Sequence, residues 1–407
     1  MRSATLGIWV AAGSITENES NNGISHFSEH MMFKGTTHRT AKQISVDVDN
    51  IGGQMNAFTT KEATGYYIRV MDKNLPEGID ILTDLVCNAT LPDDEIDKER
   101  GVVLEEIAMA NDLPEDLVMD LIAESYFLGI PLERTILGHD WNVESFTRSD
   151  LVEYMDALYT ADNMVISIAG NFDPDEVADL LDQKMQGIRQ TKAARPKSAD
   201  VSRFVPHSPA FGFTGRDIEQ VHICFGFPAT SLKSFEERYA LAVVNEVIGG
   251  SMSSRLFQKV REDLGLAYTV HSAPMLYTDT GMFCVYVGTM AKNVETVTKV
   301  IQEELANIRE NGITDAEFEQ AKRMFKGNYV LQMEFTGARM NQLAKSKLLT
   351  HRLVSEEDVL SYVDNVTQSD IAAQIERITD FDRMSAAFVG KVDDMDTLQR
   401  LALSHAS

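Results

Sequence analysis

Two histidines and a glutamate share one short segment near the start of the chain, Gly23-Ile-Ser-His26-Phe-Ser-Glu29-His30. On an α-helix, residues three and four positions apart lie on one face, so His26, Glu29 and His30 converge. Two imidazoles one turn apart can bind a single zinc ion. Glu29 lies beside that ion without being a ligand, where it can take a proton from the attacking water. The segment therefore predicts a zinc site of the inverted His-x-x-Glu-His type.

The residues around this motif are apolar. Ile24, Phe27, Met31 and Phe33 leave the helix little polar surface other than the motif itself. The alternative interpretation is a pair of surface histidines flanking a glutamate on a solvated helix. Because the surrounding residues indicate a buried helix, they favour the metal site.

A third ligand is expected from a helix farther along the chain. There Glu99, Val102, Val103 and Glu106 fall on one stripe, and the two valines indicate that this stripe faces the core. A buried, unpaired carboxylate is costly, and a zinc ion would satisfy Glu106. Glu99, two turns earlier, is expected to support the site as a partner of a ligand. Glu105 points about 100° away from Glu106 and is expected to be solvated.

With these residues identified, the chain resembles the pitrilysin/insulinase metallopeptidases, and within them the processing-peptidase branch is the most similar. The resemblance implies that His26, His30 and Glu106 hold one zinc ion per chain. It also implies that Glu29 is the catalytic base. Glu99 matches the assisting glutamate of the family, seven positions before the third ligand.

A segment that follows two glycines resembles the edge strand of the same family, which receives the substrate backbone. It contains Asn56, Ala57 and Phe58, the implied substrate-binding residues. An open strand edge can add an extended peptide as one more strand, which agrees with this role. Asn56 could also reach the substrate carbonyl. The alternative interpretation is an interior hairpin strand, which would carry fewer polar residues.

Arg261 and Tyr268, seven positions apart in the second half, resemble the arginine–tyrosine pair of the family. That resemblance implies that both residues bind substrate near the metal, where their donors can stabilise a developing oxyanion. By themselves, an arginine and a tyrosine in one segment would indicate no more than a surface salt bridge.

The elements that must position these residues occur in a similar order in the two halves of the chain. In the first half we expect strands at 4–13, 55–60, 65–71 and 164–169, and helices at 24–33, 41–50, 75–89, 93–110, 114–127, 148–158 and 173–187. In the second half we expect strands at 221–227, 267–274 and 281–288, and helices at 236–248, 253–263, 294–310 and 315–335. The repeated order predicts an internal duplication, although the metal motif occurs once.

The predicted fold class is α+β, with two similar domains that are each a mostly antiparallel β-sheet flanked by α-helices. Residues 190–210 are rich in turn formers and have little periodicity, so they are predicted to be a linker. The predicted domains are the zinc-binding catalytic domain 1–189 and a homologous domain 211–407 that carries Arg261 and Tyr268. The strand that precedes the first segment in the family is not seen, so we expect either a shortened chain or a sheet lacking one edge.

The composition of the chain argues against some classes of partner and indicates where the protein is located. The chain of 407 residues has a formal net charge of −25, which argues against nucleic acid as a partner. No stretch is apolar enough for a membrane helix, and no secretory signal is visible, so no membrane partner is expected. Cys87, Cys224 and Cys284 are few and far apart, which indicates a reducing compartment. We expect a bacterial cytoplasmic location; a mitochondrial matrix location would require a targeting peptide outside this sequence.

Together, the residues and the resemblance predict a zinc-dependent endopeptidase or oligopeptidase that hydrolyses peptides or unfolded segments within an enclosed chamber. One alternative is a presequence-processing subunit that needs a different partner chain. Another is a non-catalytic core or scaffold subunit, as in respiratory-complex proteins that resemble this family. The metal motif and the Arg261/Tyr268 pair in one chain favour a self-sufficient homodimer, and the complete ligand set disfavours the scaffold.

Overall fold

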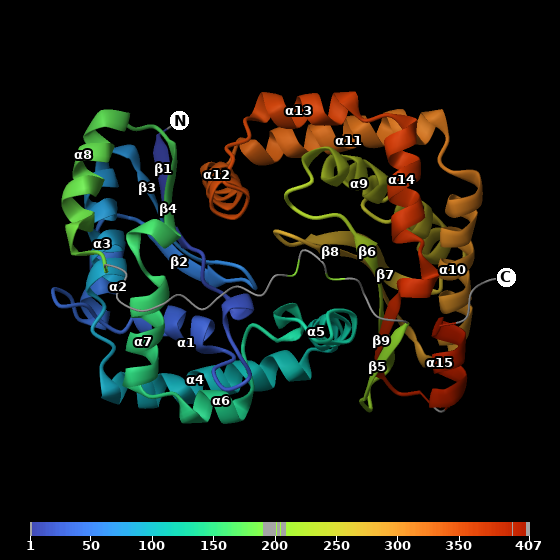
Figure 1. Ribbon diagram of the computed structural model, residues 1–407, viewed down its shortest axis with the longest axis horizontal. Helices are drawn as coiled ribbons and strands as arrows, with labels where there is room; N and C mark the ends of the chain where they lie inside the picture. Colours follow the sequence, from blue (N-terminus) through green and yellow to red (C-terminus); the bar gives the residue numbers. More distant parts are fainter. Residues whose placement is uncertain (1, 190–200, 202–203, 205–208, 393, 404–407) are drawn as a thin grey trace. The chain divides into compact units, whose positions relative to one another are not determined.

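The computed structural model describes residues 2–189, 201, 204, 209–392 and 394–403. These residues form two compact units, each built around one β-sheet (Figure 1). Unit 1 comprises Met1–Ala108, Arg134–Ala199 and Leu331–Val354, and unit 2 comprises Met109–Glu133, Asp200–Val330 and Ser355–Ser407.

The sheet of unit 1 has the strand order β2-β3-β1-β4, and all of its neighbouring strands are antiparallel. Its strands are β1 (Ser3–Val10), β2 (Gln54–Thr59), β3 (Thr64–Met71) and β4 (Met164–Gly170). β3 alternates as a strand with one core face should: Tyr66, Ile68 and Val70 are buried, whereas Arg69 and Met71 are exposed. Because β2 stands at one end of the strand order, it is an edge strand, as predicted.

Helices cover the core face of this sheet. The helices formed by the first half of the chain are α1 (Ile24–Met32), α2 (Ala41–Asn50), α3 (Leu75–Asn88), α4 (Asp93–Asp112), α5 (Pro114–Tyr126), α6 (Asp140–Ser145), α7 (Arg148–Leu158) and α8 (Pro174–Lys184). Side chains of α1, α3 and α7 join the inward residues of β1 and β3 in one hydrophobic core. α8 packs on the outer side of α3.

The opposite face of β1 is also covered, by the helix α12 (Thr336–Thr350) from the second half of the chain. Thr5 Oγ1 lies 2.7 Å from Thr336 Oγ1, and a Cβ on Gly7 would lie only 2.3 Å from Met340 Sδ. A side chain at position 7 would have to displace the end of Met340, so glycine lets the helix cross closely over the strand. Figure 1 shows α3 and α12 on opposite sides of the sheet, which explains why β1 is buried along almost its whole length.

The sheet of unit 2 has the order β5-β9-β6-β8-β7, and it is antiparallel except for the parallel pair β5–β9. Its strands are β5 (Ala210–Gly215), β6 (Gln220–Ala229), β7 (Ala267–Leu276), β8 (Gly281–Met290) and β9 (Ser385–Gly390). The helices of the second half are α9 (Phe235–Ile248), α10 (Val294–Asn311), α11 (Asp315–Met333), α12, α13 (Glu356–Asn365), α14 (Gln368–Ile378) and α15 (Met395–Leu403). The mostly antiparallel α+β fold is confirmed.

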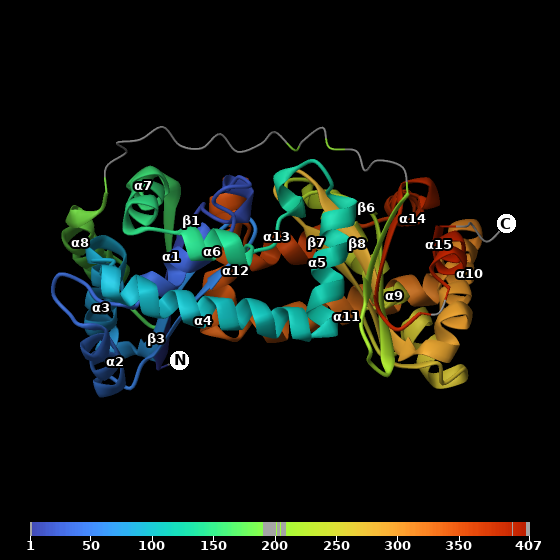
Figure 2. The ribbon, with the colours of Figure 1, turned by 90° about the horizontal axis from the view of Figure 1, so that it is seen from below.

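One face of the second sheet is covered by α5, a helix from the first half of the chain. Glycines again allow the close approach. A Cβ on Gly212 would lie 2.7 Å from Ser125 Oγ, and one on Gly226 would lie 3.2 Å from Ile122 Cγ1, although its closest contact would be Met282 Sδ of β8 at 2.6 Å. In Figure 2, α5 and α10 lie on opposite sides of this sheet.

The predicted duplication is confirmed by the order of the elements. β1, β2, β3 and β4 correspond to β6, β7, β8 and β9, because both sheets then have the same strand order, with β5 as an additional edge. α5 and α12 occupy the same place in the two series, and each packs on the sheet of the other half. The prediction of two consecutive domains, 1–189 and 211–407, does not include this exchange. Most of the predicted linker 190–210 lies outside the described residues, and Ala210 begins β5.

Two other differences from the predicted elements are informative. The helix predicted over 253–263 is a π-helical segment, η6 (Phe257–Asp263), preceded by two α-helical residues. The predicted elements end at residue 335, whereas α12 to α15 and β9 follow. Ser355 and Thr367 begin α13 and α14 with capping boxes, signals that the sequence does contain.

Candidate metal centre

The start of α1 is held by a buried carboxylate. Gly23, the residue before the helix, has φ +96°, and a Cβ there would lie 2.5 Å from Leu137 O. Glu17 is only 5% exposed and accepts hydrogen bonds from the backbone N–H groups of Gly23 (2.8 Å) and Ser25 (2.9 Å). A carboxylate at this end satisfies free N–H groups and interacts favourably with the helix dipole. The helix is buried, as predicted, and the hydrogen bonds to Glu17 hold its first residues in place just before His26.

Three ligand atoms gather between α1 and α4. His26 Nε2 lies 3.2 Å from His30 Nε2, and Glu106 Oε2 lies 3.7 Å from His26 Nε2 and 3.4 Å from His30 Nε2. In the described part of the chain, these three residues form the one group of histidine, cysteine and acidic side chains that is close enough to share a metal ion. The structure thus brings together the three predicted ligands.

The donor set and its spacing fit zinc. Two ligands that bind one zinc at roughly 2.0–2.1 Å with tetrahedral angles lie about 3.3 Å apart, close to the three separations here. If both ring nitrogens are unprotonated, two lone pairs face each other across 3.2 Å. A cation between them stabilises that arrangement, and the Glu106 carboxylate adds a negative charge on the same side.

The two histidines differ in their electrostatic surroundings. Burial, followed by the charge of His30, lowers the pKa of His26 to about 3, so this imidazole is neutral and able to ligate a metal. Burial also lowers the pKa of His30, but the hydrogen bond to Glu99 and the nearby carboxylates outweigh it, and the pKa of His30 is raised.

Glu99 supports His30 and is itself ion-paired. Glu99 Oε1 lies 2.8 Å from His30 Nδ1, which leaves His30 Nε2 directed at the ligand cluster. The other oxygen of Glu99 forms an ion pair with Lys34, which follows α1 by two residues. Burial raises the pKa of Glu99. The hydrogen bonds from His30 and Lys34 lower it by more than burial raises it, so the pKa of Glu99 is lowered overall. Glu99 is therefore an ionised hydrogen-bond partner of His30, one of the three predicted ligands.

Glu29 lies beside the cluster without being part of it. Its carboxylate Oε2 accepts a hydrogen bond of 2.5 Å from Thr59 Oγ1, at the end of the edge strand β2. Burial raises the pKa of Glu29, while the bond from Thr59 and the charge of His30 lower it and the charge of Glu106 raises it. A raised pKa suits a group that must both take and return a proton near neutral pH.

The inward stripe on α4 is only partly as predicted. Val103 is fully buried and Glu99 is 5% exposed, but Val102 is 49% exposed. The side chain of Glu106 is 45% exposed, so burial of this carboxylate is not what directs it to the metal site. Val102 lies a quarter turn from Val103, and a helix with one narrow buried face cannot bury both. Glu105 is exposed, as expected.

The predicted substrate strand is at the edge of its sheet, with β3 as its neighbour. Asn56 is exposed, and its Oδ1 accepts a hydrogen bond from the backbone N–H of Ala57, which leaves Nδ2 to donate elsewhere. The ring of Phe58 lies over Gly65 of β3 and against the ring of Trp9, with 4.8 Å between the two ring centroids. β3 is the neighbour of β2 on one side, and no other strand of the described residues pairs with its outer edge.

Arg261 and Tyr268 lie in unit 2, whereas the metal cluster lies in unit 1, and the role of this pair at the metal stays a prediction. The structure brings the two residues together. The Arg261 guanidinium carbon lies 4.5 Å from the centroid of the Tyr268 ring and 4.8 Å from that of Phe257. Tyr268 is 75% exposed. Arg261 belongs to the π-helical segment η6, and π-helical turns are frequent at functional sites.

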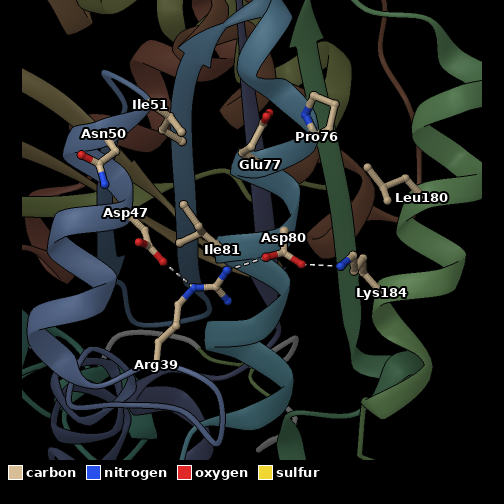
Figure 3. A pocket seen from close by; sticks show the side chains of 10 residues that line it. All are labelled: Arg39, Asp47, Asn50, Ile51, Pro76, Glu77, Asp80, Ile81, Leu180 and Lys184. Carbon is tan, nitrogen blue, oxygen red and sulfur yellow. Dashed lines mark hydrogen bonds and ion pairs between the residues drawn. The ribbon is translucent and has the colours of Figure 1, made fainter.

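A hollow of about 470 Å³ in unit 1 lies between α2, α3 and α8, away from the metal cluster (Figure 3). A chain of charges crosses it. Arg39 bonds to Asp47 at 2.9 Å and to Asp80 at 2.5 Å, and Asp80 is also ion-paired with Lys184. Because these charges are paired with one another, the cluster holds the three helices together, and we assign it no ligand.

Sequence reasoning missed Thr59, Lys34 and Glu17 as parts of the site. Thr59 and Lys34 stand inside or directly beside the recognised segments, but only tertiary contacts show what they bond. Glu17 precedes the motif by nine residues. An acidic residue shortly before a helix that has glycine at its start is a capping signal that could have been used.

Comparisons with known proteins identify the family of this chain. The family model described as Insulinase (Peptidase family M16) matches residues 1–140, and one described as Peptidase M16 inactive domain matches residues 145–325. An uncharacterized zinc protease of Bacillus subtilis is 39% identical over 366 residues, which are 90% of this chain and 88% of that protein. One of Streptomyces coelicolor is 39% identical over 376 residues, covering 92% of this chain and 82% of that protein.

Solved structures show the same fold. A protease from Helicobacter pylori superposes with a TM-score of 0.89 at 20% identity, covering 96% of this chain and 94% of that one. A protein from Pseudomonas fluorescens, described as a peptidase M16 inactive domain, superposes with a TM-score of 0.85 at 19% identity, covering 97% and 94%. No helix in the described part of the chain is long and apolar enough to cross a membrane. From its sequence relatives and the matching domain models, this chain belongs to the insulinase family, peptidase family M16.

Proposed function

We propose that this chain is a zinc-dependent endopeptidase or oligopeptidase that binds one zinc ion per chain and hydrolyses peptides or unfolded segments. The observation that carries the proposal is the convergence of His26, His30 and Glu106 beside Glu29. The names of the relatives, which are called zinc proteases, support it.

In the proposed hydrolysis, the residues of the site have different roles. A zinc ion held by His26, His30 and Glu106 would supply a Lewis acid that polarises the scissile carbonyl and acidifies water. Glu29 takes a proton from the attacking water and delivers it to the leaving amine, for which its raised pKa is suited. Glu99 holds the ring of His30 in the orientation that presents Nε2 to the cluster.

Two further features support a peptide as the substrate. The outer edge of β2 can pair with an extended main chain, with Asn56, Ala57 and Phe58 as its contacts. Arg261 and the exposed Tyr268 lie against each other and carry donors for a substrate carbonyl. We propose that they complete the substrate site within an enclosed chamber, a role that the resemblance to the processing peptidases supports.

Removal of the metal is expected to abolish hydrolysis. The purified protein should contain about one zinc per chain and should cleave a library of short peptides or an unfolded protein. Dialysis against a chelator should stop the cleavage, and stoichiometric Zn²⁺ should restore it. A protein that purifies with full zinc and cleaves nothing in the library would favour the scaffold alternative, as would one that binds no zinc.

We also propose that the enzyme is a homodimer in which the zinc unit of one chain faces the Arg261/Tyr268 unit of its partner. Both halves of the site occur in one chain, which supports this assembly. Two inactive variants, Glu29→Gln and Arg261→Ala/Tyr268→Phe, are allowed to exchange subunits. Random pairing makes about half of the dimers hybrids with one intact site, so about a quarter of the wild-type activity should return.

If both halves of the site come from one chain, every site keeps a defect, and mixing restores no activity. Exchange of the subunits is confirmed by native mass spectrometry of chains that differ in mass.

We further propose a bacterial cytoplasmic location, which the bacterial origin of the relatives and the three free cysteines support.

A further inference from the structure

The edge strand and the residue proposed as the base are joined by one hydrogen bond. Thr59 Oγ1 lies 2.5 Å from Glu29 Oε2. An ionised carboxylate can only accept, so the threonine hydroxyl donates. Among the described residues, no other hydrogen bond to the Glu29 carboxylate is formed. Oε1 can therefore accept a proton from water.

The hydroxyl is held on a rigid support. Thr59 is the last residue of β2 and pairs with Thr64 of β3. Thr64 is fully buried, and its Oγ1 donates to Ala12 O at 2.8 Å. The side chain of Thr59 is β-branched, so a strand backbone restricts its χ1 angle strongly. The position of the hydroxyl is therefore set by the sheet and not by a mobile loop.

We propose that Thr59 is a positioning residue that orients Glu29, so that the strand that receives the substrate also aims the base. The inference rests on the proposed function of this site. A peptide that pairs with the outer edge of β2 is placed in register with Thr59. The same strand therefore fixes both the bond to be cleaved and the carboxylate oxygen that takes the proton.

The test compares two variants that lack the Thr59 hydroxyl, Thr59→Val and Thr59→Ala, with one that keeps a hydroxyl, Thr59→Ser. Thr59→Val is nearly isosteric and suits a strand, and Thr59→Ala also lacks the hydroxyl but fills less space. Both are expected to lower kcat by roughly 10- to 100-fold, the range for losing one hydrogen bond to a charged group. KM, zinc content and melting temperature should stay close to those of the wild type. Thr59→Ser, which keeps the donor, should retain most of kcat.

The matched control is Thr60→Val, at the next residue. Thr60 Oγ1 bonds within the turn, where it donates to Ala63 O and accepts from the N–H groups of Glu62 and Ala63. This variant therefore loses a hydroxyl that does not contact Glu29, and its kcat should be unchanged. The inference is wrong if Thr59→Val and Thr59→Ala keep kcat within twofold of the wild type. It is also wrong if they raise KM alone, or if Thr59→Ser is as slow as they are. A wild-type protein that binds zinc and cleaves no peptide overturns the proposed function, and this inference with it.

Discussion

Replacement of Glu29 by glutamine is expected to lower kcat by roughly 10²- to 10⁴-fold, the usual contribution of a positioned general base. The amide has nearly the shape of the carboxylate, and its oxygen can still accept the hydrogen bond from Thr59. It cannot, however, take a proton from water near neutral pH. Hydrolysis of a fluorogenic peptide at saturating concentration measures the loss.

The same variant should keep its zinc, because Glu29 is outside the group of three ligand atoms. Metal content after gel filtration, measured by atomic emission, is therefore expected to equal that of the wild type. Glu105→Gln makes the same chemical change at an exposed position of α4 and serves as the control for activity. Loss of the metal, or turnover close to normal, would mean that Glu29 is a ligand or a bystander and that the assignment of roles is wrong.

The second large effect is expected in metal affinity, from a graded series on α4. Glu106→Gln removes a charged ligand and should weaken zinc binding by more than the roughly 10- to 100-fold that loss of an outer partner costs. Glu99→Gln should fall within that range, because it removes the charge that fixes His30. Glu105→Gln should bind zinc like the wild type.

Competition with a chromophoric chelator gives the three dissociation constants, and circular dichroism checks that α4 is intact in each variant. All three variants make the same substitution on one helix, so differences in helix propensity do not contribute. A variant series in which Glu105 matters more than Glu106 would show that the third ligand is misplaced. Equal losses at Glu99 and Glu106 would indicate that both carboxylates bind the metal directly.

The local part of the site could be read from the sequence. His26, Glu29 and His30 converge because helical spacing alone places positions 26, 29 and 30 on one face. The periodicity of apolar residues likewise predicted most strands and helices of the first half within a few residues. Glu106 was identified by its place on α4, but for a partly wrong reason, since Val102 is exposed and Glu106 is not deeply buried.

Contacts between distant segments were decided by the tertiary structure. The bond from Thr59 to Glu29 spans 30 residues and the ion pair of Lys34 with Glu99 spans 65, and neither spacing has a periodic signature. The exchange of α5 and α12 between the two sheets was equally hidden. An amphipathic helix shows in its sequence that one face will be buried, but not which sheet will bury it.

What the sequence by itself determined was therefore the convergence of His26, Glu29 and His30 on one helix face and the duplicated order of elements. The tertiary structure decided how close Glu99 and Glu106 come to His30, which hydroxyl bonds to Glu29 and which helix covers each sheet. The physical reason is that backbone hydrogen bonding and side-chain periodicity are local properties, whereas packing selects partners by shape. Gly7 and Gly212 illustrate this selection, because each leaves room for a helix that the other half of the chain supplies.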